Sequence, residues 1–168
     1  MNAMPTYVLD ANVFIQAARR YYAFDIAPRF WEALVEYAER GRLISIDRVK
    51  VELDRGKDEL TQWANGRFQQ WFRPTNRDDV LIVYRQIMQW SQSQHQFTAE
   101  ARADFADGDN ADAWLVAFAH ADGKIIVTHE EYDQYVRRKI PIPNACQPFK
   151  VRCVDTFQML RELCIRLG

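Results

Sequence analysis

The chain alternates between short apolar runs and longer segments whose apolar residues recur at helical spacing. Residues 7–9 are an apolar run of the kind typical of a buried parallel strand, and residues 43–46 predict a second short strand. The chain between them predicts two helices, from residue 12 to about 22 and over residues 28–41, and Asp47 is expected to cap a third. This order of strands and helices is the alternation of an α/β fold.

The last third of the chain repeats this alternation. Residues 113–121 predict an almost wholly apolar helix, residues 125–128 a buried strand and residues 151–154 a last strand. A terminal helix, capped by Asp155 or Thr156, is expected to follow. Its expected inward face consists of Phe157, Leu160, Leu163, Cys164 and Leu167.

Residues 57–105 separate these two parts. Their pattern predicts helices without a strand, so we expect an insertion-like helical part of one single domain that spans residues 1–168. Large aromatic residues concentrate between Trp63 and Phe72. Two interpretations of these aromatic residues remain open: they pack in the core, or they form a surface for a partner protein or for base stacking.

The balance of charge excludes a strongly basic protein. The chain has 22 Lys and Arg against 23 Asp and Glu, a net charge of −1. There is thus no global attraction to nucleic acid, and any binding of phosphate requires a local basic patch or metal ions. The basic residues that are candidates for such a patch are Arg19, Arg20, Arg48, Lys50, Arg137, Arg138 and Lys139.

The cysteines and the lengths of the apolar runs indicate in which cellular compartment the protein is expected. Cys146, Cys153 and Cys164 are odd in number and lack paired metal-ligand spacing, so we expect reduced thiols in a cytoplasmic protein. The first residues show no basic region followed by an apolar run, and no window approaches 18 apolar residues. Secretion and membrane spanning are therefore not expected.

Four acidic residues occupy comparable places in the predicted elements. Asp10 and Glu130 follow predicted strands, Glu52 lies early in the helix after the second strand, and Asp112 opens a helix. Strand carboxyl ends and helix starts meet at one edge of a parallel sheet, so these acids are expected to converge. Clustered carboxylates repel one another unless they take up protons or bind a cation. Oxygen ligands without histidine favour Mg²⁺ or Mn²⁺ over zinc.

The motifs around these acids resemble those of the PIN-domain ribonucleases. They are Leu-Asp-Ala-Asn at residues 9–12, Val-Lys-Val-Glu-Leu at 49–53, the helix that begins at residue 112, and Val-Thr-His-Glu at 127–130. The segment Ile-Pro-Ile-Pro-Asn-Ala-Cys at 140–146, followed by a terminal helix, resembles a prokaryotic branch allied to VapC-type toxins. The resemblance covers most of the chain.

The resemblance implies a three-layer α/β/α sandwich with a central parallel sheet of four to five strands. It also implies cleavage of RNA phosphodiester bonds that depends on Mg²⁺ or Mn²⁺. In that picture Asp10 and Asp112 hold the ion, Glu52 orients or activates its water, and Glu130 completes the site or helps a second ion.

Two further residues have a supporting role in this picture, and one position departs from the family pattern. Asn12 and Thr128 would hydrogen-bond the carboxylates and fix their rotamers. The fourth acid of the family is usually Asp, whereas this chain has Glu130 two residues after Thr128. The longer side chain puts the direct binding of metal by Glu130 in question.

Each acid also has an interpretation without chemistry. Asp10 is a credible cap of the helix that follows it, and one of Asp109 and Asp112 is expected to be only a cap. Glu52 is possible as an ordinary solvent-facing helix residue. A calcium loop that starts at Asp107 is excluded, because its twelfth position is Phe118 instead of an acid.

The resulting prediction is a metal-dependent endoribonuclease, the toxin of a type II toxin–antitoxin pair. RNA is the expected substrate, a cognate antitoxin the expected protein partner, and a homodimer is possible. The alternatives are a housekeeping RNA-processing nuclease and an inactive PIN-fold binding module. An aspartyl phosphatase is disfavoured because it needs an acid where this chain has Asn12, and a phosphoacceptor receiver is disfavoured because its central aspartate is not matched.

Overall fold

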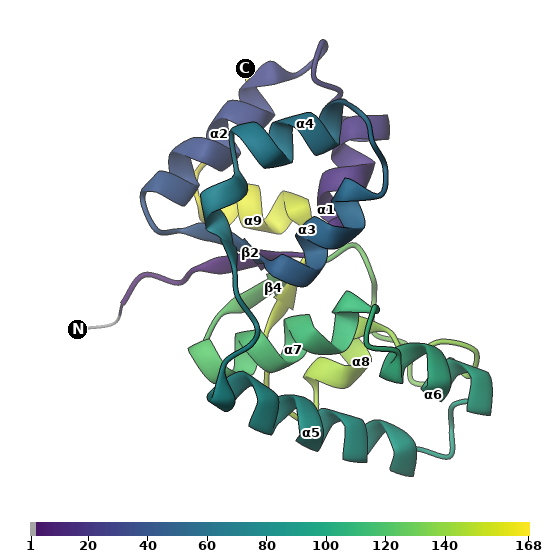
Figure 1. Cartoon of the computed structure of the whole chain (residues 1–168). Coiled ribbons are helices and arrows are strands. Elements are labelled where there is room, and N and C mark those ends of the chain that lie inside the picture. Colours follow the sequence, from purple (N-terminus) through teal and green to yellow (C-terminus); the bar gives the residue numbers. More distant parts are fainter. Residues whose placement is uncertain (1–2) are drawn as a thin grey trace.

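The computed structural model describes residues 3–168 and contains one parallel sheet at its centre (Figure 1). The strand order is β3-β2-β1-β4-β5, and every neighbouring pair is parallel. The strands are β1 (Tyr7–Leu9), β2 (Leu43–Ile46), β3 (Phe72–Arg73), β4 (Ile125–Val127) and β5 (Cys153–Val154). The prediction of a parallel α/β fold is confirmed.

Helices cover both faces of the sheet and complete the predicted three layers. In Figure 1, α1, α2, α4 and α9 lie on one side of the strands, and α5, α6, α7 and α8 lie on the other. The helices are α1 (Ala11–Gln16), the π-helix η1 (Ala17–Tyr21), α2 (Pro28–Glu39), α3 (Asp47–Asp54), α4 (Glu59–Gly66), the 3₁₀-helix η2 (Gln69–Trp71), α5 (Asp78–Ser93), α6 (Ala99–Ala106), α7 (Ala111–Asp122), α8 (Ile142–Cys146) and α9 (Thr156–Glu162).

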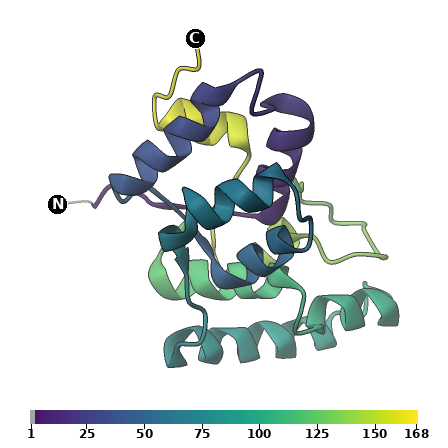
Figure 2. The ribbon, with the colours of Figure 1, turned by 45° about the horizontal axis from the view of Figure 1, so that its top comes forward.

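The core is built around β1 and α7. All residues of β1 and β2 are buried, as expected for strands covered on both faces. Helix α7 is buried along nearly its whole length because α5 covers its outer side, which Figure 2 shows from a second direction. Gly123 ends α7 in the left-handed conformation, φ +66°, which glycine adopts without strain.

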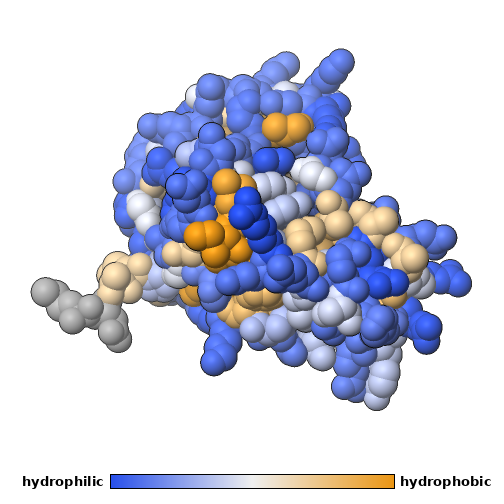
Figure 3. All heavy atoms as spheres, turned by 60° about the horizontal axis from the view of Figure 1, so that its bottom comes forward, coloured by the Kyte–Doolittle hydropathy of each residue, from blue (hydrophilic) through white to orange (hydrophobic). Residues whose placement is uncertain are grey.

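The outer face of α5 borders solvent. The side of the molecule on which α5 lies is mostly hydrophilic, with its hydrophobic atoms in small separate areas (Figure 3). Within residues 3–168, no helix combines the length and the apolar character that crossing a membrane requires. The three cysteines are free thiols, and Cys153 donates a hydrogen bond to Sγ of Cys146 at 2.9 Å.

Several sequence-based predictions need correction. Residues 57–105 are not entirely helical, because β3 adds a strand beside β2. Asp47 does not cap α3: it is the first residue of that helix, and its carboxylate instead accepts hydrogen bonds from the amide and hydroxyl groups of Thr75, at 3.1 and 2.8 Å. Phe157 and Cys164 are not on the inward face of α9, since 38% of Phe157 is exposed and Cys164 is exposed beyond the end of the helix. Asp155 is the cap of that helix and accepts from the Gln158 amide at 2.7 Å.

The aromatic residues between Trp63 and Phe72 belong mainly to the core. Phe68 is fully buried, and its ring lies against those of Phe14, Trp63 and Phe72, with centroids 5.2 to 5.7 Å away. Trp71 is also buried. The interpretation of this segment as a partner surface is therefore wrong for these residues, and only Trp63 keeps an edge that lines a small hollow.

Candidate metal and active site

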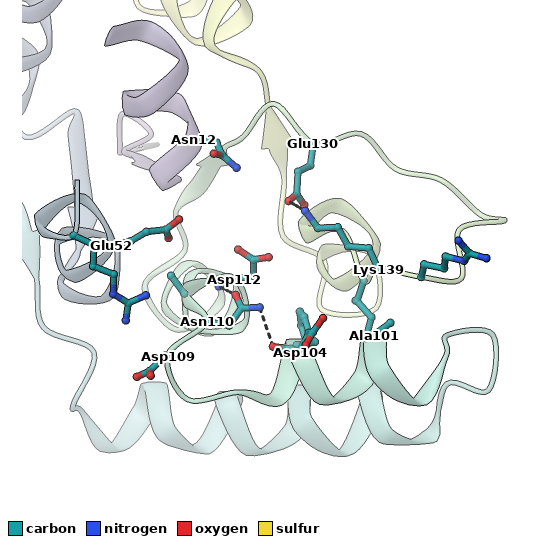
Figure 4. A pocket seen from close by; sticks show the side chains of 14 residues that line it. Asn12, Glu52, Ala101, Asp104, Asp109, Asn110, Asp112, Glu130 and Lys139 are labelled. Carbon is teal, nitrogen blue, oxygen red and sulfur yellow. Dashed lines mark hydrogen bonds and ion pairs between the residues drawn. The ribbon is translucent and has the colours of Figure 1, made fainter. Parts of the chain in front are cut away.

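The four predicted acids meet at the carboxyl end of the sheet. Glu52, Asp112 and Glu130 line a cavity of about 430 Å³ at this edge, and Asp10 is buried next to it, close enough for its charge to interact with all three. Figure 4 shows the carboxylates of Glu52, Asp112 and Glu130 facing the same space from three different elements. The convergence follows from the parallel sheet, in which β1 and β4 end side by side and α3 and α7 begin at the same edge.

Asp10 is the most deeply placed acid, with 3% of its surface exposed. It occupies the N-cap position of α1, but its side chain makes no cap hydrogen bond. Its Oδ2 instead accepts from the Thr128 hydroxyl at 3.0 Å. Burial first, and then the negative charges of Asp112 and Glu130, raise the pKa of Asp10 to about 8. The interpretation of the Asp10 side chain as a helix cap is therefore wrong, and among residues 3–168 no basic side chain forms an ion pair with this carboxylate.

Asp112 lies in the first turn of α7, partly buried in the cavity wall. The cap of this helix is Asn110, whose Oδ1 accepts from the Asp112 amide at 2.9 Å. Neither Asp109 nor Asp112 is the cap, contrary to the sequence-based interpretation. Burial and the charge of Glu130 raise the pKa of Asp112 to about 7, although Lys139 opposes the shift. Asp109 is exposed and lies at the cavity rim.

Glu52 is the sixth of the eight residues of α3, and its side chain projects toward Asp112 (Figure 4). Partial burial raises the pKa of Glu52, and the nearby guanidinium of Arg55 works against that rise. Arg55 lines the same cavity. Arg55 was not among the predicted site residues, although its position three residues after Glu52, at the C-cap of α3, is a signal that the two side chains are neighbours.

Glu130 differs from the other acids because both of its oxygens already have partners. The Lys139 ammonium group donates to Oε1, and the Ile142 amide donates to Oε2 at 2.7 Å. The backbone amide of Glu130 donates to the Thr128 hydroxyl at 3.2 Å. Thr128 thus bonds both Asp10 and the segment that carries Glu130.

Of Asn12 and the candidate basic residues, some line the cavity and others lie elsewhere. Asn12 lines the cavity, but among residues 3–168 its side chain has no hydrogen bond to a carboxylate. Of the candidate basic residues, Arg138 and Lys139 line the cavity, and Arg19 lines an adjacent hollow that shares Glu52 with it. Arg48 lies over the Trp114 ring, and Lys50 pairs with Asp54 at 2.8 Å.

The chemistry of the acids fits a hard divalent cation. Within the described part of the chain, no three acid, histidine or cysteine side chains are close enough to form a complete metal-binding group. Mg²⁺, however, is commonly held by one or two carboxylates and several waters. Asp10 Oδ1 receives no hydrogen bond from residues 3–168, and the negative charge of Asp112 contributes to the raised pKa of Asp10. We therefore regard Asp10 and Asp112 as the carboxylates of this site that fit a divalent cation.

A family model matches nearly the whole length of the chain. The family model described as a domain of unknown function, DUF4411, matches residues 7–167. The chain belongs to this family. Because the match includes all four acids, the candidate site lies inside the DUF4411 domain. No curated protein matches the sequence.

Solved structures share the fold of this DUF4411 protein. A chain of the crystal structure of FitAcB from Neisseria gonorrhoeae has a TM-score of 0.55 and 16% sequence identity, over 88% of this chain and 96% of that chain. A chain of VapBC2 from Rickettsia felis, bound to a DNA fragment from their promoter, has a TM-score of 0.55 and 13% identity, over 89% of this chain and 98% of that chain. At these identities the likeness shows the fold alone, which is PIN-like.

Proposed function

We propose that this DUF4411 protein is a metal-dependent endoribonuclease that hydrolyses RNA phosphodiester bonds, and that it is the toxin of a type II toxin–antitoxin pair. The observation that carries the proposal is the cavity lined by Glu52, Asp112 and Glu130 with Asp10 buried beside it, where the pKa of Asp10 is raised to about 8 and that of Asp112 to about 7. Such a cluster destabilises the fold, so it is best explained by binding of a cation.

In the proposed reaction Asp10 and Asp112 hold Mg²⁺ or Mn²⁺. The bound ion would supply positive charge to the phosphate and make hydroxide available near neutral pH. The Thr128 hydroxyl keeps the Asp10 carboxylate in place. Glu52 faces Asp112 across the cavity and is positioned to accept the proton of the attacking water on its carboxylate (Figure 4).

The toxin part of the proposal is supported by the resemblance to VapC-type toxins and by the fold shared with a chain of VapBC2. An antitoxin must cover the acid cavity. We propose that its segment also occupies the adjacent hollow of about 310 Å³, which shares Glu52 and Arg55 with the cavity and has the apolar lining residues Ile15, Leu53 and Leu60. This hollow replaces the residues between Trp63 and Phe72 as the candidate apolar anchor.

Cleavage of single-stranded RNA by the purified protein tests the nuclease proposal. We expect cleavage with Mg²⁺ or Mn²⁺, none in EDTA, and none by Asp10→Asn. A matched control is Asp133→Asn, which removes a carboxylate from the same edge of the molecule but outside the cavity lining. RNA that stays intact with both metals would leave the inactive binding module as the better hypothesis.

Growth of cells that express the protein tests the toxin proposal separately. We expect growth arrest by the protein alone, relief when the product of the neighbouring gene is co-expressed, and no arrest by Asp10→Asn. A harmless wild-type protein that cleaves RNA in vitro and binds no neighbouring product would favour the housekeeping nuclease. Size-exclusion chromatography of the same samples would show whether the protein forms the homodimer considered above.

A further inference from the structure

Glu130 and Lys139 form an ion pair on the wall of the acid cavity, and Figure 4 shows the ammonium group against the carboxylate. The side chain of Glu130 is 14% exposed, whereas that of Lys139 is 56% exposed. The second oxygen of Glu130 accepts from the Ile142 amide at 2.7 Å. The Glu130 carboxylate is therefore fully engaged, while the lysine remains accessible from the cavity.

The segment that carries Lys139 is held in place on both sides. Before it, the Gln96 side chain donates to the carbonyl groups of Gln134 and Val136, each at 2.8 Å, and the Thr98 amide donates to the Arg137 carbonyl at 2.8 Å. After it, Ile140 is buried, with 2% exposed. This connection between β4 and α8 runs along the edge of the molecule in Figure 2, where it is yellow-green. Lys139 is thus fixed before any ligand arrives.

The charge of Lys139 is directed at the acids. Burial alone lowers the pKa of Lys139, but the ion pair with Glu130 and the charges of Asp112 and Asp10 raise it overall. The lysine stays protonated in the cavity for this reason. An ammonium group has three donors, and one of them is used by Glu130. The other donors are available to an anion that enters beside the carboxylates.

We propose that Lys139 binds a non-bridging phosphate oxygen of the RNA backbone, and that Glu130 is a positioning residue that holds Lys139 instead of a metal ligand. This inference rests on the proposed nuclease function. A phosphodiester that approaches the acids of the cavity is repelled by their charges, and a fixed cation on the same wall offsets part of that repulsion. A metal ion on Glu130 would have to displace the ammonium group and would then repel it.

Binding of RNA without catalysis tests the role of Lys139. The affinity for a fluorescent single-stranded RNA oligonucleotide is measured by anisotropy in EDTA for the wild type, for Lys139→Met and for the control Arg85→Met. Arg85 is exposed on α5 and does not line the cavity, so its replacement removes one positive charge away from the site. We expect Lys139→Met to weaken binding about tenfold, as for a lost hydrogen bond to a charged group. The slope of the logarithm of its binding constant against the logarithm of the salt concentration should become smaller by about 0.7. This is the change expected for the loss of one phosphate contact on a single strand.

The role of Glu130 is tested by Glu130→Gln and by the double variant with Lys139→Met. If Glu130 acts through the lysine, Glu130→Gln weakens RNA binding, and the double variant binds RNA as Lys139→Met does. Calorimetric titration with Mn²⁺ alone supplies a second measurement. We expect Lys139→Met to bind Mn²⁺ at least as tightly as the wild type, and Glu130→Gln to lose less than about tenfold, because it removes a nearby negative charge but no ligand.

The outcomes separate this inference from the proposed function. Mn²⁺ affinity that falls about tenfold or more in Glu130→Gln would show that Glu130 is a ligand and overturn the positioning role. Equal RNA affinity of the wild type and Lys139→Met, in a protein that cleaves RNA, would overturn the phosphate contact alone. A wild-type protein that neither cleaves nor binds RNA would overturn both proposals, and circular dichroism of each variant identifies loss of folding.

Discussion

The hydroxyl group of Thr128 donates a hydrogen bond to Oδ2 of Asp10 at 3.0 Å, although the two residues are 118 positions apart in the chain. The bond joins the ends of the neighbouring strands β1 and β4, whose register pairs Leu9 with Val127. It is the favourable interaction that opposes the rise in the pKa of Asp10. The most deeply buried acid of the site therefore depends on a residue from the other part of the chain.

Replacement of Thr128 tests this dependence. Thr128→Val keeps the shape of the side chain but removes the hydroxyl, so Asp10 loses its hydrogen bond and binds an ion less well. We expect Mn²⁺ affinity, measured by calorimetry, to fall about tenfold or more. Thr128→Ser keeps the hydroxyl and is the matched control. Equal affinities of Thr128→Val and the wild type would mean that this bond does not position a metal ligand.

The stability of the metal-free protein is expected to fall as the pH rises. The pKa of Asp10 is raised from 3.8 to about 8 by folding, so between these values the folded state binds more protons than the unfolded state. The stabilisation that comes from protonation of Asp10 is fully present below about pH 4 and is lost as the pH rises through about 8. One unit of pKa corresponds to roughly 1.4 kcal/mol, so the loss attributable to Asp10 should exceed about 2 kcal/mol.

Urea unfolding in EDTA at pH 5 and pH 8.5 measures this loss, with Asp10→Asn as the variant that cannot ionise. We expect Asp10→Asn to be more stable than the wild type at pH 8.5, with the difference nearly absent at pH 5. Addition of Mn²⁺ at pH 8.5 should stabilise the wild type and leave Asp10→Asn unchanged. A wild-type protein whose stability is the same at both pH values would contradict the raised pKa.

Replacement of Asp112 and replacement of Asp109, two acids near the start of α7, should have very different effects on RNA cleavage. Asp112 faces the cavity with a raised pKa, whereas Asp109 is exposed at the rim. We expect Asp112→Asn to lower the rate of RNA cleavage at least about a hundredfold, the loss of a metal ligand. Asp109→Asn should lower it less than about fivefold. Equal losses in single-turnover assays of the two variants would mean that Asp109 also joins the site.

The burial of Phe68 predicts a large effect on stability. This residue is fully buried among four other aromatic rings. Phe68→Ala is expected to lower the free energy of unfolding by about 3–5 kcal/mol. Tyr135→Ala is the control, since 79% of Tyr135 is exposed and its loss should cost less than about 0.5 kcal/mol. Similar losses in urea unfolding would contradict the assignment of these aromatic residues to the core.

The sequence alone determined the class of fold and the identity of the acids that converge. Residues 43–46, which are apolar except for Ser45, indicate a buried strand because a strand covered on both faces needs mainly apolar side chains. Asp10, Glu52 and Asp112 could be placed at one edge because parallel strands end, and their helices begin, on the same side. Local order along the chain was enough for these predictions.

Only the tertiary structure decided how these residues are paired. The strand β3 has two residues, too few for a pattern, and it exists because it pairs with β2. The capping of α7 by Asn110 rather than by a neighbouring acid is a choice of geometry among equally suitable residues. The engagement of Glu130 by Lys139 and Ile142 depends on the path of a nonregular segment. Such contacts have no period in the sequence, so their partners are set only when the chain folds.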